Sequence, residues 1–238
     1  MVEPADAEAI AERCQLAFLA LPHGESAALT RELLPRGTKV IDLGSDFRLR
    51  DPADYPRYYR REHPCPELLS EAFYGLPELT GAPPAGCRLV ANPGCFATAL
   101  AVALAPLAPF LDSAARVAIS GVTGSSGSGV GLSPRVHHSL RTSNLAAYKV
   151  LEHQHLGEVR QLLASRRADG RAPALDFVPH SGPLVRGIHL TLMFRRDELT
   201  VDAAETLEAA YADAPLVDVS RGQAAQLASV LRLALIHN

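Results

Sequence analysis

The stretch CQLAFLALPHGESAALTRELLPRGTKVIDLGSDFRL, residues 14–49, decides the fold class of this chain. Two continuous apolar runs, within residues 14–24 and 38–49, enclose a segment with helical composition. Strands that are buried on both faces read as unbroken apolar runs. The stretch therefore predicts an α/β protein in which a β-α-β unit belongs to a parallel sheet with helices packed on it.

The loops that follow these two predicted strands are candidates for a cofactor site. Parallel sheets bind ligands at the carboxyl ends of their strands. Gly, Pro and Ser are also ordinary turn residues, so a purely structural explanation is about equally good. The candidate cofactor residues in the two loops are Pro22, His23, Gly24 and Ser45.

Composition and charge favour a small-molecule partner. The 238 residues are 47% hydrophobic and 21% charged, as in an ordinary globular protein, and the formal net charge is −3. Nucleic acids and anionic membranes need a basic footprint, which this chain lacks. The four cysteines form no Cys-x-x-Cys pair, the acidic N-terminus is unlike a signal peptide, and no apolar run is long enough to span a membrane. We therefore expect a cytoplasmic chain without a metal site.

The stretch LVANPGCFATALAVAL, residues 89–104, places one cysteine at a predicted strand-turn-helix corner. Its Asn-Pro-Gly sequence predicts a turn, and the Ala- and Leu-rich run after Cys95 predicts a buried helix. At a helix N-terminus, unpaired N–H groups and the helix dipole lower the pKa of a thiol. Cys95 is therefore a candidate nucleophile, and a buried structural cysteine is an equally good explanation from this feature alone.

A glycine-rich segment follows the next predicted strand. The segment ARVAISGVTGSSGSGVGL, residues 115–132, predicts a strand over 115–120 and then a loop that begins at Gly121 and includes Gly124. Such a loop can bring several backbone N–H groups close to an anion. Its spacing matches no established phosphate-binding motif, and a flexible linker explains it about as often.

Two histidines precede a predicted helix in YKVLEHQHLGEVRQLLASRR, residues 148–167. His155 and Glu158 are three residues apart and share a helix face, where a carboxylate can orient an imidazole and raise its basicity. His153 lies two residues before His155, so we expect its ring to point elsewhere. A pair of solvated histidines that only decorates the helix end is the alternative. An activated cysteine, an oriented histidine and a glycine-rich loop together favour acyl transfer through a thioester.

Six blocks of the sequence resemble, in order, the N-acetyl-γ-glutamyl-phosphate reductase family. They are LALPHG, DLGSDFRL, YGLPEL, NPGCFAT, SGVTGSSG and YKVLEHQHLGEV. The family is similar to aspartate-semialdehyde dehydrogenase, so the resemblance implies a partial Rossmann-type parallel sheet over residues 1–94 and an α+β catalytic and dimerisation domain over 95–238. It also implies a homo-oligomer, either a dimer or a tetramer.

The resemblance further implies a reaction of arginine biosynthesis. N-acetyl-γ-glutamyl phosphate is reduced to N-acetyl-glutamate semialdehyde: Cys95 attacks the acyl phosphate, phosphate leaves, and NADPH delivers hydride to the thioester. His155 serves as general acid and base, and Glu158 holds it. The substrate contacts are then Asn92, Arg141, Tyr148, His153 and Arg186, and the cofactor contacts are Pro22, His23, Gly24, Ser45, Gly121 and Gly124.

The sequence departs from the family pattern in five places. The segments VTGSSGS and HQHLGE differ from the sequences that are commoner in the family. The segment SPRVHHSLR resembles the lysine-pathway relative that acts on a carrier-bound 2-aminoadipate phosphate. Nothing before Cys14 matches the family's Gly-x-x-Gly-x-x-Gly turn, which holds the cofactor pyrophosphate. The chain ends at LASVLRLALIHN, where the family continues. We therefore expect a fragment that retains the acylation chemistry, binds NADPH weakly and shows negligible reductase turnover.

Two functions of other classes stay open at this point. A Cys-His thiol hydrolase would use the same two side chains without a nucleotide. A non-catalytic remnant would act only in subunit association through the second domain.

Overall fold

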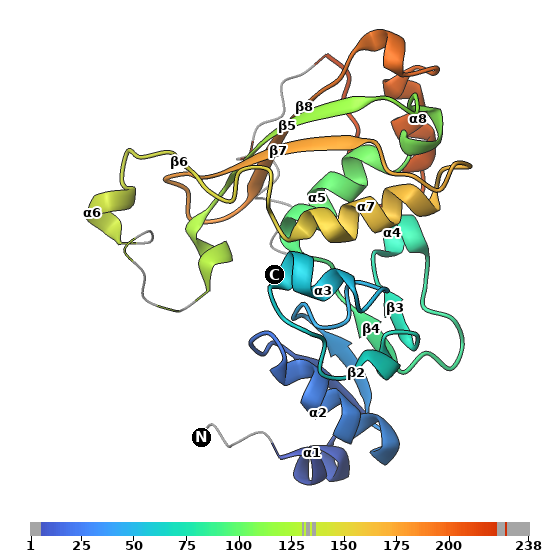
Figure 1. The fold of residues 1–238 in the computed structure, drawn as a ribbon, viewed down its shortest axis with the longest axis vertical. Coiled ribbons are helices and arrows are strands. Elements are labelled where there is room, and N and C mark those ends of the chain that lie inside the picture. The colour runs from blue at the N-terminus through green and yellow to red at the C-terminus, as the bar shows by residue number, and fades with distance from the viewer. Residues whose placement is uncertain (1–5, 130, 132–133, 135–136, 223–226, 228–238) are drawn as a thin grey trace. The chain divides into compact units, whose positions relative to one another are not determined.

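The computed structural model describes residues 6–129, 131, 134, 137–222 and 227 (Figure 1). The C-terminal LASVLRLALIHN stretch therefore lies, except for Leu227, outside the described residues. The chain forms two compact units, residues 1–98 and 99–238, and each is described by itself below. Within the described part of the chain, none of the helices combines the length and apolar character that crossing a membrane requires.

The first unit is built on a four-stranded parallel sheet. Its strands are β1 (Leu16–Leu19), β2 (Lys39–Asp42), β3 (Ala72–Tyr74) and β4 (Leu89–Ala91), in the spatial order β1-β2-β4-β3. Every neighbouring pair is parallel. The predicted parallel sheet is thereby confirmed, and the carboxyl ends of all four strands lie along one edge of the sheet.

Helix α2 (Glu25–Leu33) connects β1 to β2 and confirms the predicted β-α-β unit. Its buried apolar residues, Ala27 and Leu33, belong to one core with Val40 of β2 and Leu89 of β4. The other helices of this unit are α1 (Ala7–Arg13), α3 (Asp54–Tyr59) and α4 (Pro77–Thr80), with short 3-10 turns at Leu34–Arg36 and Pro66–Leu68. The Pro- and aromatic-rich excursion between β2 and β3 contains α3, whose Tyr55 is buried.

The second unit is built on a mixed sheet. Its strands are β5 (Arg116–Thr123), β6 (Ala146–Ala147), β7 (Ala174–Ser181) and β8 (Ile188–Met193), in the order β6-β7-β5-β8. Strand β5 is parallel to β7 and antiparallel to β8. The helices are α5 (Cys95–Leu104), which begins in the first unit, α6 (His138–Arg141), α7 (His155–Ser165) and α8 (Ala203–Ala210), with 3-10 turns at Ala108–Phe110, Ser125–Ser128 and Arg196–Glu198. A parallel sheet followed by a mixed α+β unit confirms the predicted fold class.

One boundary differs from the sequence prediction. We expected a strand over 115–120 that ends in a loop at Gly121, but β5 continues to Thr123. Its register with both neighbours continues through Gly121, because β7 supplies Pro179 and β8 supplies Leu190 opposite it. Gly121 is therefore a buried strand residue and not part of the glycine-rich loop.

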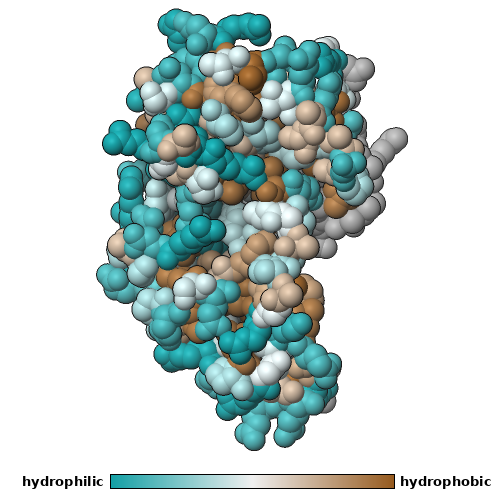
Figure 2. Space-filling view, turned by 90° about the vertical axis from the view of Figure 1, so that its right-hand side faces the viewer, coloured by the Kyte–Doolittle hydropathy of each residue, from teal (hydrophilic) through white to brown (hydrophobic). Residues whose placement is uncertain are grey.

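Hydrophilic residues cover most of the face shown in Figure 2, and apolar residues appear there in smaller patches. Strand β1 contributes two exposed apolar side chains, Leu16 and Phe18, of which Phe18 is 63% exposed. Among the described residues β1 pairs only with β2, so it forms an edge of the sheet. An apolar edge strand favours association with other chains.

Replacing Asp42 with asparagine is expected to stabilise the protein at neutral and alkaline pH. Burial at the end of β2 raises the pKa of the Asp42 carboxyl. The folded state therefore binds a proton on the Asp42 carboxyl more tightly than the unfolded state does. This contribution to the free energy of unfolding is lost as the pH rises through the raised pKa. Asparagine carries no charge and keeps an oxygen that accepts from the Gly44 N–H, as Asp42 Oδ1 does at 2.9 Å.

Thermal unfolding as a function of pH measures this effect. We expect the Asp42→Asn variant to be more stable by about 1 kcal/mol at pH 8, the size typical of single substitutions. The difference should shrink toward about pH 4, where a carboxyl of ordinary pKa also becomes protonated in the unfolded chain. A difference that does not change with pH contradicts this explanation.

Candidate active site

Cys95 is the first residue of helix α5, as predicted, and its thiol is exposed. The Thr98 N–H donates to the Gly94 carbonyl at 2.8 Å and closes the first helical turn. The two residues that follow Cys95, Phe96 and Ala97, are buried. Cys95 therefore reaches solvent at the N-terminal end of a helix.

The loop that precedes Cys95 is fixed at both backbone polar groups of Asn92. The Asn92 N–H donates to the Asp42 carbonyl at 2.8 Å, and the Asn92 carbonyl accepts from Arg48 Nε at 2.8 Å. Arg48 Nη2 also donates to the Leu43 carbonyl at 2.9 Å. The Asn92 side chain, a predicted substrate contact, donates to the Pro93 carbonyl at 3.2 Å. Arg48 thus links the ends of β2 and β4 directly before the candidate nucleophile.

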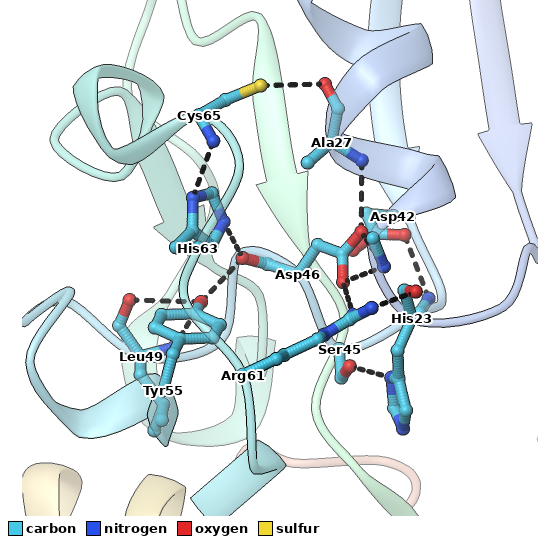
Figure 3. Close-up of polar contacts among 12 residues, drawn as sticks. His23, Ala27, Asp42, Ser45, Asp46, Leu49, Tyr55, Arg61, His63 and Cys65 are labelled. Carbon is cyan, nitrogen blue, oxygen red and sulfur yellow. Dashed lines mark hydrogen bonds and ion pairs between the residues drawn. The ribbon is translucent and has the colours of Figure 1, made fainter. Parts of the chain in front are cut away.

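The N-terminus of α2 is occupied by a carboxylate of the chain itself (Figure 3). Asp46 accepts from the Gly24 N–H at 2.8 Å through each of its oxygens and from the Ala27 N–H at 3.0 Å. Arg61 Nη2 lies 2.9 Å from the same carboxylate. The Gly24 amide, a predicted cofactor contact, is therefore already bonded to a buried anion, as helix N-termini favour.

Two further predicted cofactor residues contact each other near this carboxylate (Figure 3). The Ser45 hydroxyl hydrogen-bonds with His23 Nδ1, and Arg61 Nη1 donates to the His23 carbonyl. The His23 ring also packs edge-to-face on Tyr59, with the ring centroids 5.3 Å apart. Ser45 is buried, whereas His23 is exposed. Of the predicted cofactor residues at this sheet edge, only Pro22 and His23 are exposed.

Sequence reasoning missed the side chains that hold the loop after β2. The Tyr55 hydroxyl and His63 Nε2 both donate to the Asp46 carbonyl at 2.5 Å, while His63 Nδ1 accepts from the Cys65 N–H at 3.0 Å. Burial lowers the pKa of His63, in agreement with a neutral ring that carries its proton on Nε2. The signal was present in the aromatic and histidine residues of the irregular excursion, which the sequence alone did not connect to Asp46.

In the second unit, the two histidines flank the start of α7. His155 is the first residue of the helix and Glu158 lies one turn later; both are buried, Glu158 completely. The prediction that His153 points elsewhere is wrong, because the His153 and His155 ring centroids lie 4.6 Å apart in an edge-to-face contact. The helical spacing rule does not apply to His153, since α7 begins after it.

His153 has a structural role at the start of α7. Its Nδ1 accepts from the His155 N–H at 3.2 Å and thereby caps the helix. Its ring packs against Phe177 and Tyr148, with centroid distances of 5.6 and 5.8 Å. Burial, aided by the nearby Lys149 charge, lowers the pKa of His153 to about 4. The ring is therefore neutral at physiological pH, with its proton on Nε2.

The segment before His153 carries backbone strain. Lys149 and Leu151 have φ angles of 44° and 63°, in the left-handed region that non-glycine residues rarely adopt. The Leu151 N–H donates to the Phe177 carbonyl of β7 at 2.9 Å, and Lys149 Nζ donates to Gln154 Oε1 at 2.7 Å. These contacts hold the segment in its strained conformation next to β7.

The glycine-rich loop does not form an anion-binding nest at its first three residues. The N–H groups of Gly124, Ser125 and Ser126 donate to the carbonyls of Gly187, Leu184 and Val185 at 2.9–3.1 Å. A Cβ atom on Gly124 would lie 2.6 Å from the Arg186 backbone, so glycine is required for this close approach. Arg186, a predicted substrate contact, is itself exposed.

Arg141, another predicted substrate contact, is bonded to the same loop between β7 and β8. Its Nη1 donates to Ser181 Oγ at 2.5 Å, and its Nη2 donates to the Gly182 carbonyl and, at 3.2 Å, to the Leu184 carbonyl. The Arg141 guanidinium therefore holds the loop between β7 and β8 in place. Among the described residues no group of three or more His, Cys, Asp or Glu side chains is arranged to hold a metal ion.

The structure thus brings the predicted residues together in four groups. Asn92 and Cys95 share the loop that Arg48 holds, and Pro22, His23, Gly24 and Ser45 surround Asp46. In the second unit, Tyr148, His153, His155 and Glu158 cluster at the start of α7, whereas Gly124, Arg141 and Arg186 lie around the loop between β7 and β8.

Comparison with known proteins gives matches to both units. A family model described as the semialdehyde dehydrogenase dimerisation domain matches residues 95–237, and one described as the semialdehyde dehydrogenase NAD binding domain matches residues 1–83. The fold is similar to the crystal structure of aspartate semialdehyde dehydrogenase II from Vibrio cholerae, with a TM-score of 0.57 and 14% identity over 91% of this chain and 64% of that one.

Two curated relatives with higher sequence identity to this chain have the same name. The N-acetyl-gamma-glutamyl-phosphate reductase of Pseudomonas savastanoi pv. phaseolicola is 44% identical over 208 residues, and that of Pseudomonas aeruginosa is 43% identical over 207. Each alignment covers 87% of this chain and 60% of the relative. The chain therefore spans about 60% of the length of these curated relatives.

Proposed function

This chain belongs to the semialdehyde dehydrogenase family, and on that premise we propose that it carries the acylation chemistry of an N-acetyl-γ-glutamyl-phosphate reductase. The observation that carries the proposal is the exposed Cys95 thiol at the first residue of α5. The identity of 44% to a curated protein of that name supports the substrate, an acyl phosphate with an N-acetylglutamyl group.

In the proposed step, Cys95 forms a thioester with the substrate. A bond forms between Cys95 Sγ and the acyl carbon, the bond from that carbon to the phosphate oxygen breaks, and inorganic phosphate leaves. The thiol proton passes to a general base. The dipole at the α5 N-terminus favours the thiolate that attacks. The step needs no oxidant or reductant.

His155 is the proposed acid and base, and Glu158 is proposed to orient it. Both side chains are buried on the first turn of α7, where residues three apart share a face. The role of His153 supports this choice of histidine. Its Nδ1 is bonded to the His155 N–H, and its pKa is lowered to about 4, so it is a poor proton acceptor at neutral pH.

The proposed cofactor is NADP(H), which, when bound, supplies the hydride that reduces an acyl group to an aldehyde. The match of residues 1–83 to the NAD binding domain supports it. Pro22 and His23 fit as contacts because both are exposed at the carboxyl edge of the parallel sheet. The Gly24 amide does not fit as a pyrophosphate ligand, because it donates to Asp46, and the Gly124 amide donates to Gly187.

Self-association and a reducing compartment complete the proposal. Residues 95–237 match a domain described as a dimerisation domain, which supports a homo-oligomer. All four cysteines are free, as is usual in the cytoplasm.

Alkylation by iodoacetamide at neutral pH tests the role of Cys95. Cys14 is the matched reference, since it is also exposed but lies at the opposite end of its helix, as the C-cap of α1. We expect Cys95 to react about 3- to 30-fold faster than Cys14, the ratio given by opposite helix ends. Peptide mapping over time reads out each cysteine separately.

The remaining cysteines complete the test, and a substrate assay separates the competing functions. Cys87 is half-buried and Cys65 fully buried, so both should react later than Cys95. If Cys14 is alkylated first, Cys95 is not the nucleophile. With an acyl phosphate, a labile acyl adduct on Cys95 supports the proposal, whereas rapid hydrolysis of amides or thioesters without nucleotide identifies a thiol hydrolase.

A further inference from the structure

We propose that Arg48 is a positioning residue whose buried guanidinium holds the loop that presents Cys95, so that the reactivity of the thiol depends on Arg48. The inference rests on the proposed role of Cys95 as the nucleophile. The role of Arg48 cannot be predicted from the spacing of any sequence motif. It is identified by its burial and by the two carbonyl groups that it joins.

The guanidinium of Arg48 joins two loops at the carboxyl edge of the parallel sheet. Its Nη2 donates to the Leu43 carbonyl, directly after β2, and its Nε donates to the Asn92 carbonyl, three residues before Cys95. The backbone N–H of Asn92 donates to the Asp42 carbonyl. The backbone of Asn92 is therefore held at both its N–H and its carbonyl, and only Pro93 and Gly94 separate Asn92 from the start of α5.

The backbone that carries Arg48 is itself rigidly held. Tyr55 donates its hydroxyl to the Asp46 carbonyl at 2.5 Å and contacts the Leu49 N–H and carbonyl at 3.3 Å (Figure 3). Phe47 and Leu49, the neighbours of Arg48, are 3% and 1% exposed. Movement of the loop after β2 is thus restricted on both sides of Arg48, and the loop before Cys95 is bonded to a fixed point.

The side chain at position 48 has to be arginine for this geometry. Arg48 is 8% exposed, and a permanent charge that is buried needs polar acceptors. The planar guanidinium places Nε and Nη2 in a fixed fork, which can reach two carbonyls on separate loops at once. Lysine has a single nitrogen at the end of a flexible stem and cannot reproduce both bonds in the same orientation.

The test is the pH dependence of Cys95 alkylation in the whole chain, compared between the wild type, Arg48→Met and Arg48→Lys. Without its anchor, the loop no longer holds the thiol at the α5 N-terminus. We expect the neutral-pH rate at Cys95 to fall at least about threefold and the midpoint of the rate profile to move to higher pH. The matched control is Arg50→Met, which removes an exposed arginine two residues away and should leave the profile unchanged.

Two other cysteines make every outcome decisive. The exposed Cys14 should keep its rate in all variants, and the buried Cys65 becomes reactive only if the first unit unfolds. An unchanged Cys95 profile with Cys65 protected overturns the inference about Arg48 alone. If Arg48→Met makes Cys65 reactive, the Arg48→Lys variant decides the question. A lower alkylation rate at Cys95 with Cys65 still protected supports the inference, and an unchanged Cys95 profile overturns it. A wild-type Cys95 no faster than Cys14 instead overturns the proposed function.

Discussion

Replacing Cys95 with alanine is expected to reduce phosphate release from N-acetyl-γ-glutamyl phosphate by about 10⁴-fold or more, to the uncatalysed level. The thiol supplies the electron pair that displaces phosphate, and no other group described here replaces that bond. The measurement is the release of inorganic phosphate by the purified chain, which continues beyond one phosphate per Cys95 as water hydrolyses the thioester, together with the intact mass after brief exposure to substrate. The wild type should show a mass increase of one acyl group, and the variant none.

Cys14→Ala is the control for this experiment. Cys14 is exposed, as Cys95 is, but it lies at the C-terminal end of α1 and has no proposed role. Its replacement should leave both phosphate release and the acyl adduct unchanged. Phosphate release that survives in Cys95→Ala would assign the chemistry to another group, and an acyl adduct that moves to a second cysteine would identify that group.

Features set by local sequence could be predicted well. The apolar runs around β1 and β2, the Ala-Leu helix after Cys95 and the apolar pattern of α7 each specify an element through burial and periodicity, and all were found. The end of β5 could not be placed in the same way. Glycine at position 121 signals a turn, but pairing with β7 and β8 continues the strand to Thr123, and that pairing comes from distant residues.

The contacts of individual side chains were less predictable, for the same reason. Asp46 reads as a turn residue in sequence, yet it caps α2 from 22 residues beyond Gly24. Arg141 is a predicted substrate contact, and in the structure its donors are bonded to carbonyls about 40 residues later in the chain. The contacts of such charged and polar residues depend on which loops the fold brings together. The helical or strand periodicity of a sequence does not indicate which loops meet.

The two histidines provide the second large expected effect. Replacing His155 with asparagine is expected to lower kcat for phosphate release by about 10²- to 10⁴-fold with little change in KM, because proton transfer is lost while substrate binding is kept. The pH dependence of the rate should flatten, since the titrating base is gone. Glu158→Gln should cost less than His155→Asn, because the amide keeps the shape of the carboxylate and removes only its charge.

His153→Asn is the matched comparison, since it is the same substitution two residues away. Asparagine at this position still offers an oxygen to the His155 N–H, so the start of α7 should persist. The ring contacts with Phe177 and Tyr148 are lost, so we expect a lower thermal stability, by about 1–2 kcal/mol, with kcat reduced far less than in His155→Asn. If His153→Asn instead causes the larger fall in kcat and the flatter pH profile, the base is His153. Its buried and neutral ring would then have to gain a proton during the reaction, which the lowered pKa of about 4 strongly disfavours.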